Sequence, residues 1–339
     1  MTDATLVTNG SADTTADTMA ASPQGGRRHR RRYSQLSRAD KVWLSLMVGI
    51  PTVIHIMFVW VPTLGTVALS FTKWDGIKLG SWEAVGFKNY WAIFTIFDPK
   101  FFPALFNNLI LLVFLGGCST VGILFAYLLD KGVRGSAIYQ SVFYLPVVLS
   151  LAVVGFIWKS VMFSQSQGLF NLGRDKPIDF VGNSERLFTF HIPFLDSPLG
   201  LTKNFAALLV AMAWRHIGYV MVLYLAGLKS VDPSLREAAS IDGCNEWQSF
   251  RRVVFPVMKP INVVVLVITV IEALRAFDII VALKEPVGTT VLGVLVKKNL
   301  TGEGGGQVGL GSAYGVILLL LCLGFIIWYL FNNYRESES

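Results

Sequence analysis

The sequence predicts an all-α membrane protein with six transmembrane helices. Of its 339 residues, 53% are hydrophobic and only 15% are charged, a smaller charged share than soluble globular proteins have. The hydrophobic residues are gathered in long blocks, whereas a soluble helical core would spread them along each helix at a regular spacing. Six blocks reach or exceed the roughly twenty residues that cross the hydrocarbon core of a bilayer. They cover residues 42–71, 105–129, 136–163, 204–228, 261–283 and 311–331.

Residues 1–40 precede the first block and show no apolar periodicity. Their richness in Ser, Thr, Ala, Gly and Asp predicts a disordered tail, followed by one transmembrane domain over residues 41–335. The tail contains the basic cluster Arg27–Arg32. Such a cluster is compatible with binding to nucleic acid or anionic lipid. Beside a first span, however, it is typical of the signal that holds the N-terminus in the cytoplasm. We therefore expect no nucleic-acid partner, although the net charge is +7.

With the N-terminus inside, an even number of spans places both termini in the cytoplasm. Loops 130–135 and 229–260 are then cytoplasmic, and both are basic, as the positive-inside rule requires. Their basic residues include Lys131, Arg134, Lys229, Arg236, Arg251, Arg252 and Lys259. We therefore expect a multi-pass protein of the cytoplasmic membrane, surrounded by lipid. Pro51 and Pro62 are expected to bend the first span, which neighbouring helices can tolerate.

The polar loop 229–260, between the fourth and fifth spans, carries helix signals of its own. Asp232 is a typical N-cap, and Pro233 follows it at the first helical position. Gly243 supplies the left-handed residue that can end a helix. One face of this helix would present Leu235, Ala238, Ala239 and Asp242 at helical spacing.

A second short helix is expected directly after the first. Asn245 and Gln248 make an N-cap and capping-box pair, and Pro256 ends the helix. Phe250, Val253 and Val254 would lie on one side of it. The loop is thus predicted to be a helix–turn–helix at the membrane face.

The segment EAASIDGCNEWQSFRRVVFP, residues 237–256, resembles the EAA loop of permease subunits from binding-protein-dependent ABC importers. That family has EAA, three residues and glycine, then an apolar-x-x-proline ending after a fixed gap. The matching residues are Glu237, Ala238, Ala239, Asp242, Gly243, Phe250, Val253 and Pro256. Cys244 stands where the family usually has alanine. SFTKWDG (70–76), GFKNY (86–90) and RAFDIIVAL (275–283) are similar to the carbohydrate-importer branch, and the resemblance extends from Lys41 to Tyr334.

The resemblance implies a permease subunit that works with several partners. These are a second permease in a heterodimer, two ATP-binding subunits and an extracytoplasmic solute-binding protein, for which the outer loop 164–203 is a candidate docking segment. Closure of the ATP-binding subunits would pull on the EAA helices and so rock the spans by alternating access. The implied solute is a mono- or oligosaccharide. The alternatives are another polar solute, such as a polyol or a glycerol-phosphate derivative, or transport by an ion-driven secondary transporter.

The first EAA helix is the expected contact with the ATP-binding subunit. Its small residues beside an exposed leucine would let another protein pack closely, and Glu237, early in the helix, suits the positive end of the helix dipole. The expected coupling residues are Leu235, Glu237, Ala238, Ala239, Asp242 and Gly243. The alternative is a surface helix that only stabilises the ends of the fourth and fifth spans.

Charged residues inside the fifth span are candidates for a solute pathway. Glu272, Arg275 and Asp278 recur at spacings of three, so on a continuous helix they lie within an arc of roughly 120°. Each charge would cost about 2.5–3.5 kcal/mol on a lone helix in lipid, so the three must face the interior of the bundle. A solute pathway and a network that only neutralises itself are both compatible with this pattern.

The fourth span has adjacent polar residues at its midpoint. Arg215 needs an acidic or carbonyl partner, for which Glu272 or Asp278 on the fifth span is suitable. His216 is expected to be a hydrogen-bonded packing residue, because no chain of acidic residues accompanies it as a proton relay would require. A sugar site needs polar side chains and aromatic platforms in an otherwise apolar cavity. The expected pathway residues are Trp214, Arg215, Tyr219, Glu272, Arg275, Phe277 and Asp278.

Several chemistries are excluded by what the sequence lacks. It has no GxxxxGK[ST] phosphate loop and no GxSxG elbow, so we expect no enzyme, and ATP must be bound by a partner subunit. Three scattered cysteines and four histidines without a cluster predict neither a metal site nor a disulfide framework. A secondary transporter would show inverted repeats and broken helices, and a membrane enzyme would need paired carboxylates or a His cluster. We find none of these patterns.

Overall fold

The computed structural model describes residues 37–78, 80–95, 99–165, 168–191, 198–302 and 306–337. The predicted disorder of the tail and the role of its Arg27–Arg32 cluster therefore concern residues outside this description, except at 37–40. The chain divides into two compact units, 1–57 and 58–339, and each is described by itself. In the first unit, α1 (Arg38–His55) begins with a capping box: Ser37 Oγ accepts from the Asp40 N–H, and Asp40 accepts from the Ser37 N–H. The first helix thus starts a few residues before the predicted span.

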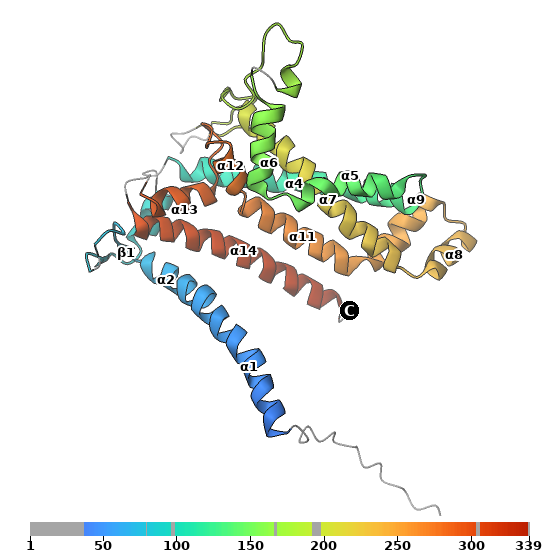
Figure 1. Ribbon diagram of the computed structural model, residues 1–339, viewed down its shortest axis with the longest axis horizontal. Coiled ribbons are helices and arrows are strands. Elements are labelled where there is room, and N and C mark those ends of the chain that lie inside the picture. Colours follow the sequence, from blue (N-terminus) through green and yellow to red (C-terminus); the bar gives the residue numbers. More distant parts are fainter. Residues whose placement is uncertain are drawn as a thin grey trace, which may run out of the picture. The chain divides into compact units, whose positions relative to one another are not determined.

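The second unit is built almost entirely of helices (Figure 1). The π-helical turn η1 (Ile56–Trp60) leads into it. Its elements are α2 (Val61–Leu69), β1 (Thr72–Lys73), β2 (Glu83–Ala84), α3 (Lys88–Phe94), α4 (Phe101–Asp130), α5 (Ser136–Val148), α6 (Leu151–Ile157), η2 (Trp158–Met162), η3 (Leu169–Asn171), α7 (Lys203–Ser230), α8 (Pro233–Ile241), α9 (Glu246–Ser249), η4 (Phe250–Val254), α10 (Phe255–Val257), α11 (Lys259–Leu274), α12 (Asp278–Ala282), α13 (Leu292–Leu300) and α14 (Val308–Ser337). The two short strands are antiparallel, with Thr72 opposite Ala84.

Helices α4 and α7 lie side by side at the centre of this unit, and α11 packs against both (Figure 1). The buried residues of α4 recur every three or four positions because one face of the helix meets the core. They include Leu111, Leu115, Cys118, Gly122, Ala126 and Leu129. The helices approach closely at Gly122, where an added Cβ would lie 2.8 Å from Val220. Small residues at such contacts let helix backbones pack tightly within a membrane.

The predicted third span, 136–163, is not one straight helix. It consists of α5 and the α6–η2 segment, which are bent by 103° relative to each other. Leu149 is extended, and Ser150 caps α6 by accepting from the Val153 N–H. Sequence hydropathy did not reveal this bend, because both arms are apolar and the cap is a single serine.

The predicted fifth span, 261–283, is also interrupted. Helix α11 ends at Leu274, and α12 begins only at Asp278. A second bend of 76° separates the α9–α10 segment, 246–257, from α11. The arc of charged residues predicted for a continuous fifth span is therefore wrong: Glu272 lies on α11, Arg275 caps it, and Asp278 opens α12.

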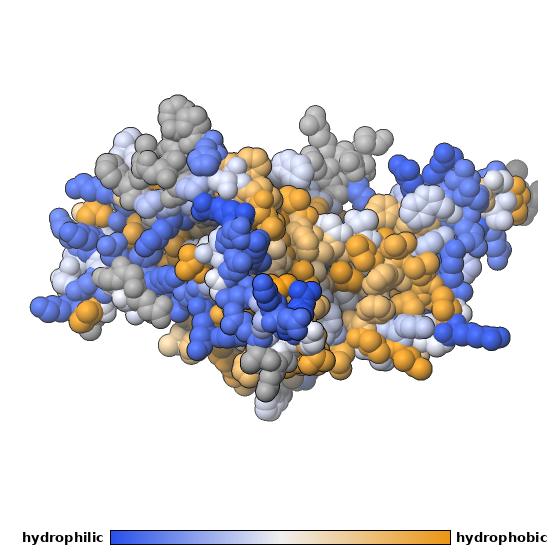
Figure 2. Space-filling model, turned by 90° about the horizontal axis from the view of Figure 1, so that it is seen from above, coloured by the Kyte–Doolittle hydropathy of each residue, from blue (hydrophilic) through white to orange (hydrophobic). Residues whose placement is uncertain are grey.

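Four helices in the described residues are long and apolar enough to cross a membrane, and the number rises to six if each bent pair is one span. Figure 2 shows hydrophobic side chains over the middle of the visible face, with hydrophilic side chains gathered toward its ends. Within loop 164–203, isolated antiparallel bridges join Arg186 to Thr202 and Phe190 to Leu199.

Candidate functional site

The helix–turn–helix predicted for loop 229–260 is present, and we call this segment the coupling loop. Asp232 Oδ1 accepts from the Ser234 N–H at 2.9 Å, and this backbone hydrogen bond lowers the pKa of the Asp232 carboxyl. Gly243 has φ +82° and ends α8. Its N–H bonds to the Ser240 carbonyl, and the Cys244 N–H bonds to the Ala239 carbonyl, which is the Schellman arrangement.

The second helix of the coupling loop also begins as predicted. Asn245 and Gln248 exchange hydrogen bonds of 2.8 and 2.9 Å in a capping box. After α9, a π-helical turn carries Phe250 and Val254 into the core, where both are buried with residues of α4 and α7. The coupling loop is thus anchored by its second helix, which leaves α8 on the surface.

Most of the expected coupling residues are exposed on α8. Glu237, Ala238, Asp242 and Gly243 are exposed, as is Leu235. Ala239 is buried within the chain, and the contact expected of it stays a prediction. Ile241 is 86% exposed and was missed. A large apolar residue two positions before the helix-ending glycine was the available signal.

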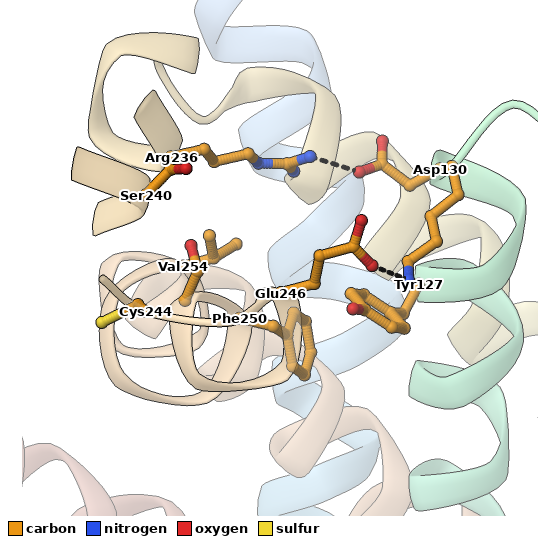
Figure 3. Close-up of a pocket in the computed structure, with 10 residues that line it drawn as sticks. Tyr127, Asp130, Arg236, Ser240, Cys244, Glu246, Phe250 and Val254 are labelled. Carbon is orange, nitrogen blue, oxygen red and sulfur yellow. Dashed lines mark hydrogen bonds and ion pairs between the residues drawn. The ribbon is translucent and has the colours of Figure 1, made fainter. Parts of the chain in front are cut away.

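Two ion pairs join the coupling loop to the end of α4 (Figure 3). Arg236 Nη1 of α8 lies 2.7 Å from Asp130 Oδ2, and Arg236 Nη2 also donates to the Leu228 carbonyl. Glu246 of α9 pairs with Lys131, and this hydrogen bond raises the pKa of Lys131. Adjacent residues at one helix end therefore hold both helices of the loop. The contacts surround a cavity of about 250 Å³, with Tyr127 and Phe250 on its wall.

A second cavity, which we call the polar pocket, lies among the long helices. It has a volume of about 320 Å³. It brings together five of the seven expected pathway residues, although they come from three separate segments. Its lining residues are Leu151, Arg215, Tyr219, Ile268, Ile271, Glu272, Arg275 and Asp278.

Glu272 is the centre of the hydrogen-bond network beside the polar pocket. Its Oε1 accepts from Arg215 Nη1 at 2.6 Å, which confirms the partner expected for Arg215. Its Oε2 lies 2.7 Å from His216 Nδ1. The His216 ring is fully buried, and its Nε2 lies 3.0 Å from Ser119 Oγ on α4. His216 is thus a hydrogen-bonded packing residue, as predicted, and the network ties α7, α11 and α4 together.

The other charged residues of the pocket are not part of this network. Arg275 and Asp278 are exposed and form no ion pair with each other or with any other side chain in the described part of the chain. The self-neutralising trio is therefore not formed. Both side chains remain available to a ligand or to another subunit.

The two remaining pathway candidates do not line the polar pocket. Trp214 packs edge-on against Trp158, with ring centroids 5.8 Å apart. Phe277 is half-buried against the same hydrophobic core, close to Gly293. Both residues contact the hydrophobic core of the helix bundle. Their side-chain directions depend on helix rotation, which the sequence pattern did not reveal.

A helical, apolar chain with an anchored helix–turn–helix insert and a polar pocket among its long helices has the features of the membrane component of a solute transporter. The family model described as the inner membrane component of binding-protein-dependent transport systems matches residues 118–336. The chain belongs to this family. It is a multi-pass membrane permease of the ABC importer class, and a transport component rather than an enzyme.

Individual relatives agree with this assignment. The chain is 31% identical to the xylose/arabinose import permease XacH of Haloferax volcanii, over 85% of this chain and 87% of the relative. It is 34% identical to GgtC of Synechocystis sp., an uptake permease for osmoprotective compounds, over 82% of this chain and 92% of the relative. A crystal structure of a bacterial alginate ABC transporter contains a chain with the same fold, at a TM-score of 0.68 and 22% identity, over 88% of this chain and 96% of that chain.

Proposed function

We propose that this permease translocates a mono- or oligosaccharide across the cytoplasmic membrane, driven by ATP hydrolysis in a partner subunit. The observation that carries the proposal is the polar pocket, whose unpaired Arg275 and Asp278 face a cavity wide enough for a sugar ring. Cations and carboxylates are balanced there, two of each, which favours an uncharged sugar over a phosphate-bearing solute. The relative named for xylose and arabinose supports the same choice. A polyol is the second candidate, because another relative is named for osmoprotective compounds.

Substitution of the unpaired charges tests the pathway. Arg275→Ala and Asp278→Ala should each reduce sugar uptake by the reconstituted transporter at least tenfold or so, because a sugar hydroxyl left without a partner costs roughly 1–3 kcal/mol. The amount of assembled complex should be unchanged. Normal uptake with both substitutions would show that the pocket is only structural. Uptake driven by an ion gradient, without ATP or partner subunits, would favour a secondary transporter.

The proposed topology has six spans, with both termini and the coupling loop in the cytoplasm; the bent α5–η2 segment counts as the third span, and the fifth begins with α11, after the coupling loop. The basic residues of loops 130–135 and 229–260 support this orientation. A reporter active only in the cytoplasm should be active when fused after Ser136 or Lys259 and silent at Gly182. The reverse pattern at any of these positions would overturn the map.

In the proposed assembly, α8 seats in a cleft of an ATP-binding subunit. Leu235, Ala238 and Ile241 supply exposed apolar contacts, and Glu237 makes a charged one. The partners are a second permease in a heterodimer, two ATP-binding subunits and an extracytoplasmic solute-binding protein that docks on the outer loop. Copurification of the tagged chain should recover these subunits.

Substitutions in α8 test the coupling role. Glu237→Lys and Gly243→Val should each abolish uptake and uncouple or release the ATPase, yet leave solute binding by the external protein intact. Valine is strained at the positive φ of Gly243. An Ala238→Cys variant should crosslink to the ATP-binding subunit. Normal transport by both variants and no crosslink would leave α8 as a helix that only stabilises the neighbouring spans.

A further inference from the structure

The break between α11 and α12 shapes the polar pocket. Helix α11 ends at Leu274, and the Phe277 N–H bonds to the Arg275 carbonyl instead of continuing the helical ladder. In an unbroken helix the Phe277 N–H would bond to the carbonyl of Ala273. That carbonyl is buried and needs another donor, since an unpaired buried polar group is costly.

The missing donor comes from α4. Asn108 Nδ2 donates to the Ala273 carbonyl at 2.7 Å, and Asn108 Oδ1 accepts from the Leu292 N–H at 2.9 Å. The Asn108 residue is only 2% exposed. One side chain therefore pairs both the end of α11 and the first residue of α13.

The packing around the break agrees with this role. The residues on either side, Ala273, Ala276 and Leu292, are fully buried. A Cβ added to Gly293 would lie 3.0 Å from the Cβ of Phe277, so α13 begins directly against the break. Ala273 directly follows Glu272 and lies two residues before Arg275, so its position bears on where both pocket residues lie.

The neighbouring asparagine holds a different part of the chain. Asn107 Nδ2 donates to the carbonyls of Gly288 and Thr290 at 3.0 and 2.8 Å. Asn107 is 5% exposed, so it is buried to nearly the same degree as Asn108. It secures the connection before α13, and in the described residues its side chain forms no hydrogen bond to residues 273–278. The pair therefore offers a matched comparison.

We infer that Asn108 is a positioning residue of the solute pathway: it holds the α11–α12 break open and so sets Glu272, Arg275 and Asp278 around the polar pocket. This inference rests on the proposed function of that pocket. Without the Asn108 amide, an unpaired Ala273 carbonyl would recover its partner by closing the helix across residues 275–277. Asp278 would then turn with the helix and leave its place in the pocket.

The test compares variants of the complete transporter, reconstituted with its solute-binding protein. The readout is sugar uptake per ATP hydrolysed, which does not depend on how much complex folds. Asn108→Leu should lower this ratio about tenfold, while ATPase stimulation by the loaded binding protein persists. Asn108→Asp keeps the acceptor for Leu292 but loses the donor to Ala273, so it should be equally deficient. Asn107→Leu should retain the wild-type ratio.

Hydrogen exchange supplies a readout that needs no solute. Asn108→Leu should change the exchange rate of the amides at residues 274–279 and raise that of the Leu292 amide. Asn108→Asp should alter exchange only at the break, residues 274–279. Asn107→Leu should alter exchange in neither segment. A wild-type uptake ratio in Asn108→Asp, or unchanged exchange at the break in Asn108→Leu, would overturn the inference. Absence of sugar uptake by the wild-type transporter would instead contradict the proposed function, and the exchange comparison would still decide whether Asn108 holds the break.

Discussion

Glu272 of α11 and Arg215 of α7 form an ion pair of 2.6 Å beside the polar pocket. Their side chains are only 10% and 24% exposed, and the carboxylate also contacts the buried His216 ring. A charge so far from water needs its partner, because the loss of one member leaves the other desolvated and unpaired. The pair therefore couples the integrity of two spans to the shape of the pocket.

Neutralising this pair from one side should be more harmful than removing it entirely. Glu272→Gln leaves Arg215 without an anion and should destabilise the fold by about 3–5 kcal/mol. Combining Arg215→Met with Glu272→Met should recover much of that loss. Thermal unfolding of the purified permease complex measures both. Equal melting temperatures for wild type and Glu272→Gln would contradict the role assigned to the pair.

At Gly218, helix α7 packs directly against the backbone of α5. A Cβ added there would lie 1.9 Å from the carbonyl oxygen of Phe143. This oxygen belongs to the backbone, so it cannot move aside as the end of a flexible side chain can. Gly218→Ala should therefore destabilise the fold by about 1–3 kcal/mol, measured as lost monodisperse complex after heating. Gly116→Ala on α4 is the control, because nothing lies within 4 Å of that position in this chain. A harmless Gly218→Ala would mean that α5 is not held against α7.

The Asp130–Arg236 pair should transmit movement of α8 to α4. Asp130 is the more buried partner, at 12% exposure. Asp130→Arg places two cations together and should reduce transport-coupled ATPase several-fold. The exchanged variant, Asp130→Arg with Arg236→Asp, should recover part of it. If the single and double variants have equal ATPase activity, the contact has no part in coupling. It would then resemble the many surface ion pairs that contribute little.

The loop after α12 should be sensitive to acid through Glu285. Burial opposes its ionisation, but hydrogen bonds from Lys298 and Lys297 outweigh this and hold the pKa of Glu285 below its usual value. A lowered folded-state pKa means that the stabilisation is present above the unfolded value, near 4.5, and is lost as the pH falls through the folded value. Glu285→Gln should remove this stabilisation and so lower the free energy of unfolding by about 1 kcal/mol at pH 7.

Melting temperatures measured from pH 7 to pH 3 check this expectation. The difference in melting temperature between wild type and Glu285→Gln should become smaller as the pH falls. A second variant separates charge from backbone strain: Lys284 has φ +66°, so Lys284→Gly should relieve strain at every pH. If the difference in melting temperature between wild type and Glu285→Gln stays constant over this pH range, the ion pairs of Glu285 are not the cause of that difference.

The sequence by itself determined the features that depend on neighbouring residues. Long apolar blocks marked the candidate spans, because crossing a bilayer needs a continuous apolar stretch. Asp232, Gly243 and Asn245 marked the boundaries of the coupling-loop helices, since capping bonds reach only a few residues along the chain. The same local signals carried the family resemblance that the comparison of residues 118–336 confirmed.

Only the tertiary structure decided how these helices are interrupted and rotated. Asn108 pairs with a carbonyl 165 residues away, and Glu272 reaches Arg215 across 57 residues. Ala239 is buried while Ala238 beside it is exposed, which distinguishes two positions with the same side chain. The helical spacing of residues in the sequence does not predict such contacts. Inside a membrane, where lipid is as apolar as the helix faces, the rotation of each helix is set by packing and by polar partners from distant segments.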